Sequence, residues 1–202
     1  MVSDETGIAL IRAAQITSAS IRDAFFFIVE IIEKTPEKES GLRFTTILSD
    51  LKKPGVILWT LLPVVSSVLS ILLGKLLFDN RFVEHVLGRT SSLLSFDQML
   101  KLIGQLIIGA FGEEIAFRGF FVGKGMKIFP YWPCAVVSSL IFAAAHYAAG
   151  NIGVVIYDLA GIFIDALIYA TIYRKTGNCV ISTIAHFLCN AVGLIITFAF
   201  FM

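Results

Sequence analysis

The sequence predicts an all-α protein, a polytopic transmembrane helical bundle of about five spans with an amphipathic helix in front of it. Its 202 residues are 57% hydrophobic and only 15% charged, which is far more apolar than a soluble domain of this length needs. Five apolar windows are each long enough to cross a hydrocarbon core of about 30 Å as a helix. These predicted spans are Val56–Phe78, Met99–Val122, Trp132–Ala149, Ile152–Tyr173 and Cys179–Phe201.

The segment before the first span, Ile8–Ile32, combines apolar residues with one polar stripe. The stripe recurs at helical intervals and consists of Arg12, Gln15, Arg22, Asp23 and Glu30. We predict an amphipathic helix in the membrane interface, with a sixth span as the alternative, because a charged stripe is costly to bury in lipid. The polar linker Glu33–Gly55 follows. The predicted domains are therefore residues 1–55, the amphipathic helix with its linker, and residues 56–202, the transmembrane bundle.

The placement of Lys and Arg predicts how the bundle is oriented. One side of the membrane receives nine of them: Lys34, Lys38, Arg43, Lys52, Lys53, Lys124, Lys127, Arg174 and Lys175. The other side receives Arg81, Arg89 and Lys101. The positive-inside rule places the first group in the cytoplasm of a multi-pass protein of the cell membrane. The net charge of +1 gives no indication of a nucleic-acid partner.

Three charged residues, Glu113, Glu114 and Arg118, interrupt the second span. An ionised side chain at such a depth costs at least about 2.5 kcal/mol, so these residues should be paired or functional. Glu114 and Arg118 stand four positions apart on one helical face and can form a buried ion pair. Glu113 is rotated by about 100° from Glu114 and therefore faces a different environment.

Two further polar sites lie in apolar spans. His146 ends the pattern Phe142-Ala-Ala-Ala-His146 in the third span, and His186 shares a helical face with Asn190 in the fifth. Counted from the cytoplasmic ends at about 1.5 Å per residue, the depths are roughly 14 Å for Glu113, 21 Å for His146, 11 Å for His186 and 17 Å for Asn190. With ordinary helix tilt, these side chains are predicted to meet in one cavity.

The residue types in this cavity suit hydrolysis by activated water. A desolvated glutamate can act as general base toward water, and a nearby histidine can share the proton or orient the water. A second histidine and an asparagine amide can donate hydrogen bonds to the oxyanion that forms when water attacks an amide. Cys189 is rotated by about 100° from the face of Asn190, which argues against a thiol nucleophile.

The patterns Glu-Glu-x-x-x-Arg, Phe-x-x-x-His and His-x-x-x-Asn, in this order on successive membrane helices, resemble the CPBP family. This family, also called Abi, contains type II CAAX prenyl endopeptidases and bacteriocin-processing or self-immunity proteins. The resemblance covers residues 99–201, about half of the chain, and Gly112 and Gly119 also match the family.

The resemblance implies a glutamate-dependent intramembrane protease that requires no metal and no cofactor. Glu113 would be the activating carboxylate, His146 would help to activate water, and His186 with Asn190 would form the oxyanion site. Glu114 and Arg118, together with the packing residue Phe142, would support this constellation. The partners would be membrane lipids and a peptide or lipidated-protein substrate. Because the chain is shorter than the eight-helix prenyl-protein proteases, the resemblance favours a small prokaryotic member that acts on a peptide.

Two other functions stay open at this point. Zinc held by Glu113, His146 and His186 would give a metal-dependent protease, although the sequence lacks a His-Glu-x-x-His pair. A non-proteolytic scaffold or bacteriocin self-immunity protein would use the same bundle without hydrolysis. A proton-coupled carrier is disfavoured, because the broken helices and paired half-repeats of many transporters are absent from the sequence.

Overall fold

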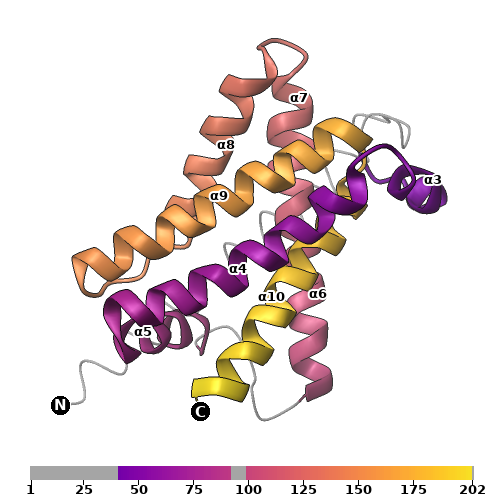
Figure 1. The fold of residues 1–202 in the computed structure, drawn as a ribbon. Helices are drawn as coiled ribbons and strands as arrows, with labels where there is room; N and C mark the ends of the chain where they lie inside the picture. The colour runs from indigo at the N-terminus through magenta and orange to yellow at the C-terminus, as the bar shows by residue number, and fades with distance from the viewer. Residues whose placement is uncertain (1–40, 92–98, 202) are drawn as a thin grey trace, which may run out of the picture. The chain divides into compact units, whose positions relative to one another are not determined.

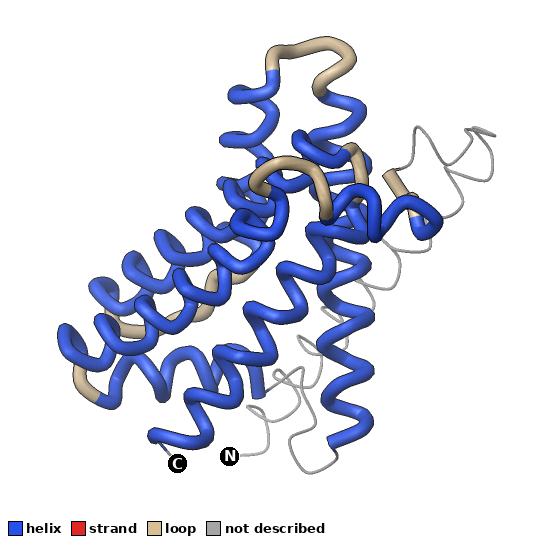
Figure 2. The backbone as a smooth tube through the Cα atoms, turned by 45° about the vertical axis from the view of Figure 1, so that its right-hand side comes forward, coloured by secondary structure: helices blue, strands red, loops and turns tan. Residues whose placement is uncertain are grey.

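The structure is a computed structural model that describes residues 41–91 and 99–201 of the chain. This part of the chain is helical and contains no strand, which confirms the predicted all-α class (Figure 2). The predicted amphipathic helix Ile8–Ile32 and much of the linker lie outside the described residues. The division of the chain at residue 55 stays a prediction.

The described helices follow the predicted order closely. They are η1 (Phe44–Thr46), α3 (Ile47–Leu51), α4 (Val56–Phe78), α5 (Asn80–Ser91), α6 (Met99–Glu114), η2 (Ile115–Val122), α7 (Gly123–Gly125), α8 (Tyr131–Ala145), α9 (Ile152–Thr176) and α10 (Cys179–Phe201). Among the described residues, α4, α9 and α10 are long and apolar enough to cross a membrane, whereas α8 is apolar but shorter. The segments α6, η2 and α7 follow one another without leaving helical backbone conformation, so the second predicted span is one continuous rod.

Two predictions of local structure were wrong. The sequence between the first two predicted spans, residues 79–98, predicts a loop, but it contains α5, whose Phe82 and Val83 are buried and hold this helix against its neighbours. The third predicted span ends at Ala145 and not at Ala149. The chain must leave the helix there, because Asn151 already caps α9 by accepting hydrogen bonds from the backbone of Gly153 and Val154.

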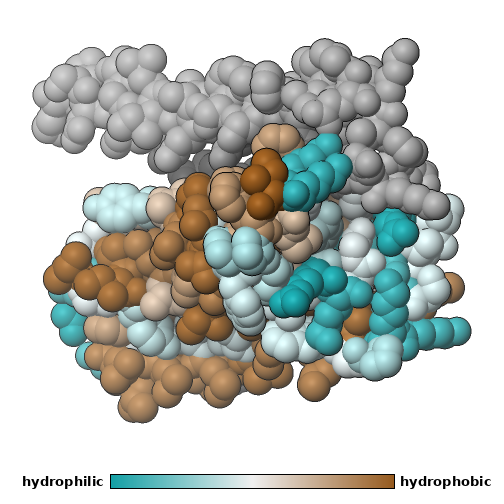
Figure 3. All heavy atoms as spheres, turned by 90° about the horizontal axis from the view of Figure 1, so that it is seen from above, coloured by the Kyte–Doolittle hydropathy of each residue, from teal (hydrophilic) through white to brown (hydrophobic). Residues whose placement is uncertain are grey.

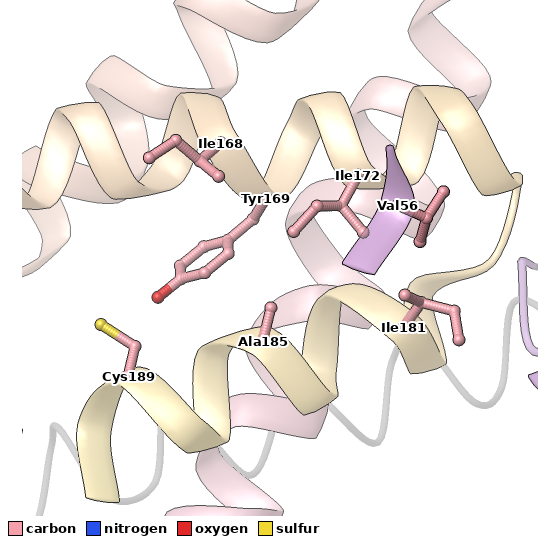
Figure 4. Packing of buried hydrophobic residues seen from close by; sticks show 7 residues of the cluster. All are labelled: Val56, Ile168, Tyr169, Ile172, Ile181, Ala185 and Cys189. Atoms are coloured by element: carbon pink, nitrogen blue, oxygen red, sulfur yellow. The ribbon is translucent and has the colours of Figure 1, made fainter. Parts of the chain in front are cut away.

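The long helices α4, α9 and α10 pack together, and α9 lies alongside α4 with α10 crossing beside them (Figure 1). Their shared core contains Val56 from α4, Ile168, Tyr169 and Ile172 from α9, and Ile181, Ala185 and Cys189 from α10 (Figure 4). The rod α6–η2 packs against α10 on one side and α8 on the other. This arrangement places the polar patterns of three predicted spans around one end of α10.

The turn between α9 and α10 is fixed by a buried asparagine. Gly177 ends α9 with a left-handed backbone (φ 65°), and its N–H bonds the carbonyl of Tyr173 at 2.7 Å. Asn178 is fully buried and accepts a hydrogen bond from the N–H of Val180 at the start of α10. Its amide donates to the carbonyl of Arg43 at 2.8 Å and to Asp50 at 2.9 Å. The end of the linker is thereby held against the α9–α10 turn.

Apolar side chains cover much of the outer surface of the bundle. Exposed large hydrophobic residues are numerous on α4, α6 and α8, as expected of faces that contact lipid. In a view onto the end that carries the α7–α8 connection, the hydrophilic residues among the coloured ones gather mainly toward the right and the hydrophobic ones toward the left (Figure 3). This distribution supports a membrane location.

Candidate active site

Glu114 and Arg118 form the ion pair that their spacing predicts. Arg118 Nη1 lies 3.1 Å from Glu114 Oε1, and both side chains are 0% exposed. Arg118 also donates a hydrogen bond to the carbonyl of Ala166 on α9 at 2.8 Å. A buried ion pair with additional hydrogen bonds balances charges that would each be costly alone. The pair therefore ties the α6–η2 rod to α9.

Aromatic rings enclose the guanidinium of Arg118. Its Cζ lies 4.7 Å from the ring centre of Phe142 and 5.2 Å from that of Tyr169. Such cation–π contacts stabilise a desolvated cation more than an exposed one. Phe142 is thus a support for Arg118, and the same ring packs against His146 at 4.6 Å.

The helix changes its winding immediately after the two glutamates. Residues 115–122 form the π-helix η2, and the hydroxyl of Ser138 on α8 donates to the carbonyl of Phe117 within it at 3.3 Å. π-helical turns are rare and occur frequently at functional sites. This wider turn carries Arg118, so the change of winding lies directly beside the polar cluster.

Glu113 lies between two histidines from different helices. His146 Nε2 is 3.9 Å from Glu113 Oε1, and His186 Nε2 is 3.7 Å from Glu113 Oε2. These separations exceed a direct hydrogen bond, which for nitrogen and oxygen spans about 2.7–3.2 Å. The side chain of Glu113 is 38% exposed, whereas that of His186 is 5% exposed. One carboxylate therefore faces two imidazoles at a spacing slightly longer than a direct hydrogen bond, so a shared water molecule would bind to the side of the pair.

The other nitrogen of each histidine has a fixed partner. His146 Nδ1 lies 2.8 Å from the carbonyl of Phe142, which can only accept, so Nδ1 carries the proton. His186 Nδ1 lies 3.0 Å from Glu114 Oε1 and likewise donates to it. The carbonyl of Phe142 thus orients the ring of His146, and the carboxylate of Glu114 orients the ring of His186. Both rings present Nε2 to Glu113.

A cavity of about 80 Å³ adjoins the two histidines. It is lined by Arg89, Phe142, His146, Ile162, Asp165, Tyr169, His186, Cys189 and Asn190. A cavity of this size with polar walls holds a few water molecules. Glu113 is not among the lining residues, but its carboxylate lies within 4 Å of both histidines that are. The structure therefore brings Glu113, His146 and His186 together and places Asn190 on the wall of the same cavity.

Sequence reasoning missed two residues of α9 at this cavity. Tyr169 stacks on His186, with ring centres 4.7 Å apart and planes inclined by 19°. Asp165 lies one helical turn before Tyr169, and its Oδ2 is 3.8 Å from the thiol of Cys189. In the fourth predicted span, Asp158, Asp165 and Tyr169 follow one another at intervals of seven and four positions, and this helical spacing was the available signal.

A second polar cluster borders the cavity through Arg89. Asp158 accepts from Arg89 Nη2 at 3.3 Å and lies 3.1 Å from Arg89 Nε. His85 Nε2 is 3.5 Å from the same carboxylate. His85, which lies between the first two predicted spans in the sequence, belongs to α5 and meets α9. The cluster fixes α5 beside the cavity.

No group of three or more His, Cys, Asp or Glu side chains in residues 41–91 and 99–201 is positioned to hold a metal ion. The predicted zinc ligands Glu113, His146 and His186 do face one another, at the distances given above. The other ring nitrogen of His146 bonds to the carbonyl of Phe142, and that of His186 bonds to the carboxylate of Glu114.

Comparison with known proteins gives one family match, which covers the segment that carries the site. Residues 95–192 match the family model described as type II CAAX prenyl endopeptidase Rce1-like. The search of curated proteins and the search of solved structures give no match. The matched range contains all three polar patterns and every residue that lines the cavity except Arg89. Over residues 95–192, just under half of the chain, the sequence is thus similar to the Rce1-like type II CAAX prenyl endopeptidases, and this match confirms the resemblance to the CPBP family.

Proposed function

We propose that the chain is an intramembrane endopeptidase that hydrolyses a peptide bond with water activated at Glu113. The observation that carries this proposal is the position of one partly exposed carboxylate within 4 Å of two imidazole nitrogens. A water molecule between these groups would donate one proton to Glu113 and a second hydrogen bond to His146 Nε2, which is unprotonated when Nδ1 donates to Phe142.

The chemistry needs no covalent enzyme intermediate. Glu113 takes a proton from water as the water oxygen bonds to the scissile carbonyl carbon. The resulting tetrahedral species collapses when the carbon–nitrogen bond breaks, and the proton held by Glu113 passes to the leaving nitrogen. His146 orients the water and shares the proton during the transfer. The two products are a carboxylic acid and an amine, and the protein returns to its starting state.

His186 and Asn190 are proposed to stabilise the oxyanion. Both line the cavity, and they lie one helical turn apart on α10. Asn190 offers its amide N–H groups. His186 Nδ1 is held by Glu114, and its Nε2 lies toward Glu113, at the mouth of the same cavity. Preorganised donors of this kind are worth about 100- to 1,000-fold in rate.

The substrate is proposed to be a membrane-associated peptide or a lipidated protein. The family description fits a carboxyl-terminal CAAX-like segment, and the same chemistry would cleave a bacteriocin precursor or a signal-peptide fragment. In each case the scissile bond must reach a site beside apolar faces that contact lipid.

The test compares peptide termini in membranes of cells that express the wild-type chain or Glu113→Gln. We expect at least one terminus that requires Glu113, and we expect the exposed-carboxylate control Glu84→Gln to keep it. His146→Gln should lose the same terminus. If Glu113→Gln and His146→Gln both retain every terminus and the full cellular phenotype, the chain acts as a non-proteolytic scaffold or immunity protein and the proposal is wrong.

Treatment with a zinc chelator distinguishes the proposed mechanism from a zinc-dependent one. The purified chain in proteoliposomes should keep cleaving the identified peptide after exhaustive treatment with a zinc chelator. Loss of cleavage that returns on adding zinc would replace the Glu113 water mechanism by a zinc mechanism at the same residues.

A further inference from the structure

We infer that Asp165 is a substrate-contacting residue that accepts a hydrogen bond from a main-chain N–H next to the scissile bond. This inference rests on the proposed endopeptidase function. Its first support is the composition of the cavity. Among the lining residues, Asp165 is the one that bears a carboxyl group, because Glu113 lies beside the histidines and not on the wall.

The carboxyl group of Asp165 is not satisfied by the fold. Its Oδ1 is buried and has no hydrogen-bond partner among the described residues. The donors that the fold gives this carboxyl group are the thiol of Cys189, 3.8 Å from Oδ2 and close to the limit for a sulfur donor, and the Ser66 hydroxyl of α4, and they leave Oδ1 without a partner. A buried acceptor without a good donor costs free energy, so its retention calls for an explanation by function or by a bound molecule.

The position of Asp165 follows from two adjacent layers of α9 and α10. In the first layer, Tyr169 stacks on His186. In the second layer, Asp165 of α9 faces Cys189 of α10, next to Asn190. Figure 4 shows the ring of Tyr169 extending from α9 toward α10, with its hydroxyl directed at Cys189. Asp165 is therefore one helical turn, about 5.4 Å along the axis, from the layer that contains His186.

This spacing matches the repeat of an extended peptide. Successive residues of an extended chain are about 3.3 Å apart. A peptide that runs along this wall with its scissile carbonyl at the level of His186 would therefore place an N–H one or two residues away at the level of Asp165. His186 and Asn190 of α10 would supply hydrogen-bond donors for a peptide carbonyl, and Asp165 would supply the acceptor for a peptide N–H. The cavity can therefore bind both polar groups of a peptide main chain.

Arg89 makes a side-chain cation a less suitable occupant than a neutral amide. Its guanidinium lines the same cavity and is held there by Asp158. A Lys or Arg side chain bound to Asp165 would place two cations in one small cavity of low dielectric. A peptide N–H is neutral and satisfies the carboxyl oxygen without that repulsion.

The experiment uses the full-length chain in proteoliposomes and a synthetic peptide spanning the Glu113-dependent cut. Four further peptides each replace one amide N–H within two residues of the cut by an ester oxygen, with the scissile amide kept. For the wild-type chain, we expect one of these replacements to lower kcat/KM about tenfold, mainly through KM.

Three variants then assign the lost hydrogen bond. Asp165→Leu should lower kcat/KM for the all-amide peptide about tenfold and should show no further loss with the sensitive ester. Asp165→Asn retains a side-chain carbonyl acceptor and should stay within about threefold of the wild-type chain, with the ester effect intact. Thr171→Val, which changes α9 away from the cavity, should match the wild-type chain in both respects.

Each contrary result has one meaning. If Asp165→Leu keeps the same ester effect as the wild-type chain, the inference is wrong, and any loss of activity or lower unfolding temperature then reports a packing role. If no ester affects the wild-type chain, the inference is also wrong. If no peptide terminus depends on Glu113, the proposed endopeptidase function is wrong, and the inference about Asp165, which rests on that function, is wrong as well.

Discussion

His186 Nδ1 and Arg118 Nη1 meet the same oxygen, Oε1 of Glu114, at 3.0 Å and 3.1 Å. Glu114 thereby links a structural ion pair to a proposed catalytic ring. The neighbouring Glu113 faces the opposite nitrogen of that ring. Two adjacent glutamates thus act on one imidazole from its two sides, and they differ in burial.

This difference predicts opposite effects of two conservative variants. Glu114→Gln leaves the guanidinium of Arg118 buried without its counter-ion, so it should destabilise the chain by about 3–5 kcal/mol. Glu113→Gln affects a side chain that is 38% exposed and should leave unfolding nearly unchanged while abolishing cleavage. Thermal unfolding in detergent micelles, measured beside the cleavage assay, separates the two. Equal unfolding temperatures for both variants would contradict the assignment of Glu114 as the structural partner.

Tyr169 is predicted to matter through its ring. Tyr169→Phe keeps the stack on His186 and the contact with Arg118, so cleavage should change less than threefold. Tyr169→Ala removes a fully buried ring and should cost about 3–5 kcal/mol of stability. At a temperature where both variants are folded, Tyr169→Ala should show a lowered kcat. A large loss of cleavage in Tyr169→Phe would instead assign a role to the hydroxyl group.

Asp50 predicts a pH-dependent contribution to stability. Burial opposes its ionisation, but hydrogen bonds from Lys53, Asn178 and Thr46 outweigh that effect and hold its pKa below the ordinary value of 3.8. The contribution of a carboxylate with a lowered pKa is complete above its unfolded-state pKa and is lost as the pH falls through its folded-state pKa.

The wild-type chain should therefore be more stable than Asp50→Asn at pH 7, and the gap should shrink in acid below about pH 4. Unfolding temperatures measured in micelles across this range test the expectation. Glu84→Gln serves as the control, because Glu84 is an exposed carboxylate. A gap between the wild-type chain and Asp50→Asn that does not change with pH would show that the charge of Asp50 is not what holds the linker to Asn178.

Two glycine variants test how closely the helices approach. A Cβ at Gly74 would lie 2.6 Å from Cγ of Phe82, so Gly74→Ala must displace α5 from α4 and should cost about 1–3 kcal/mol. A Cβ at Gly109 on α6 meets no atom within 4 Å, so Gly109→Ala should be neutral or stabilising. Expression level and unfolding temperature of the two variants provide the comparison. Equal destabilisation would show that the packing of Phe82 on Gly74 is not rigid.

Helix positions could be predicted from the sequence because long apolar runs in a membrane have few alternatives. The bounds of α4 and α10 agree with the predicted spans, and the start of α9 does as well. The structure of the segment between the first two spans was harder to predict. Helix α5 is short and amphipathic, and its stability depends on tertiary contacts of Phe82 and Val83 that local sequence does not reveal.

Most residues of the polar site could also be predicted from the sequence. Charged and imidazole groups inside apolar spans are rare, so Glu113, Glu114, Arg118, His146 and His186 were conspicuous. Asp165 and Tyr169 belong to the fourth span, whose Asp158, Asp165 and Tyr169 also share helical spacing, but that spacing does not indicate which face of the helix meets α10. The π-helix at residues 115–122 was also not predictable, because it depends on packing of α8 against the rod and not on residue type.

The small volume of the cavity limits the shape in which a substrate can be cut. An α-helix with its side chains is about 10–12 Å wide, far too large for a space of about 80 Å³. A membrane-spanning substrate would have to unwind before its scissile bond could reach His186 and Asn190 on the wall of this cavity. Segments rich in Gly or β-branched residues unwind at lower cost than segments rich in Ala or Leu. Helix propensity around the cut, more than the identity of any one side chain, should therefore rank competing substrates.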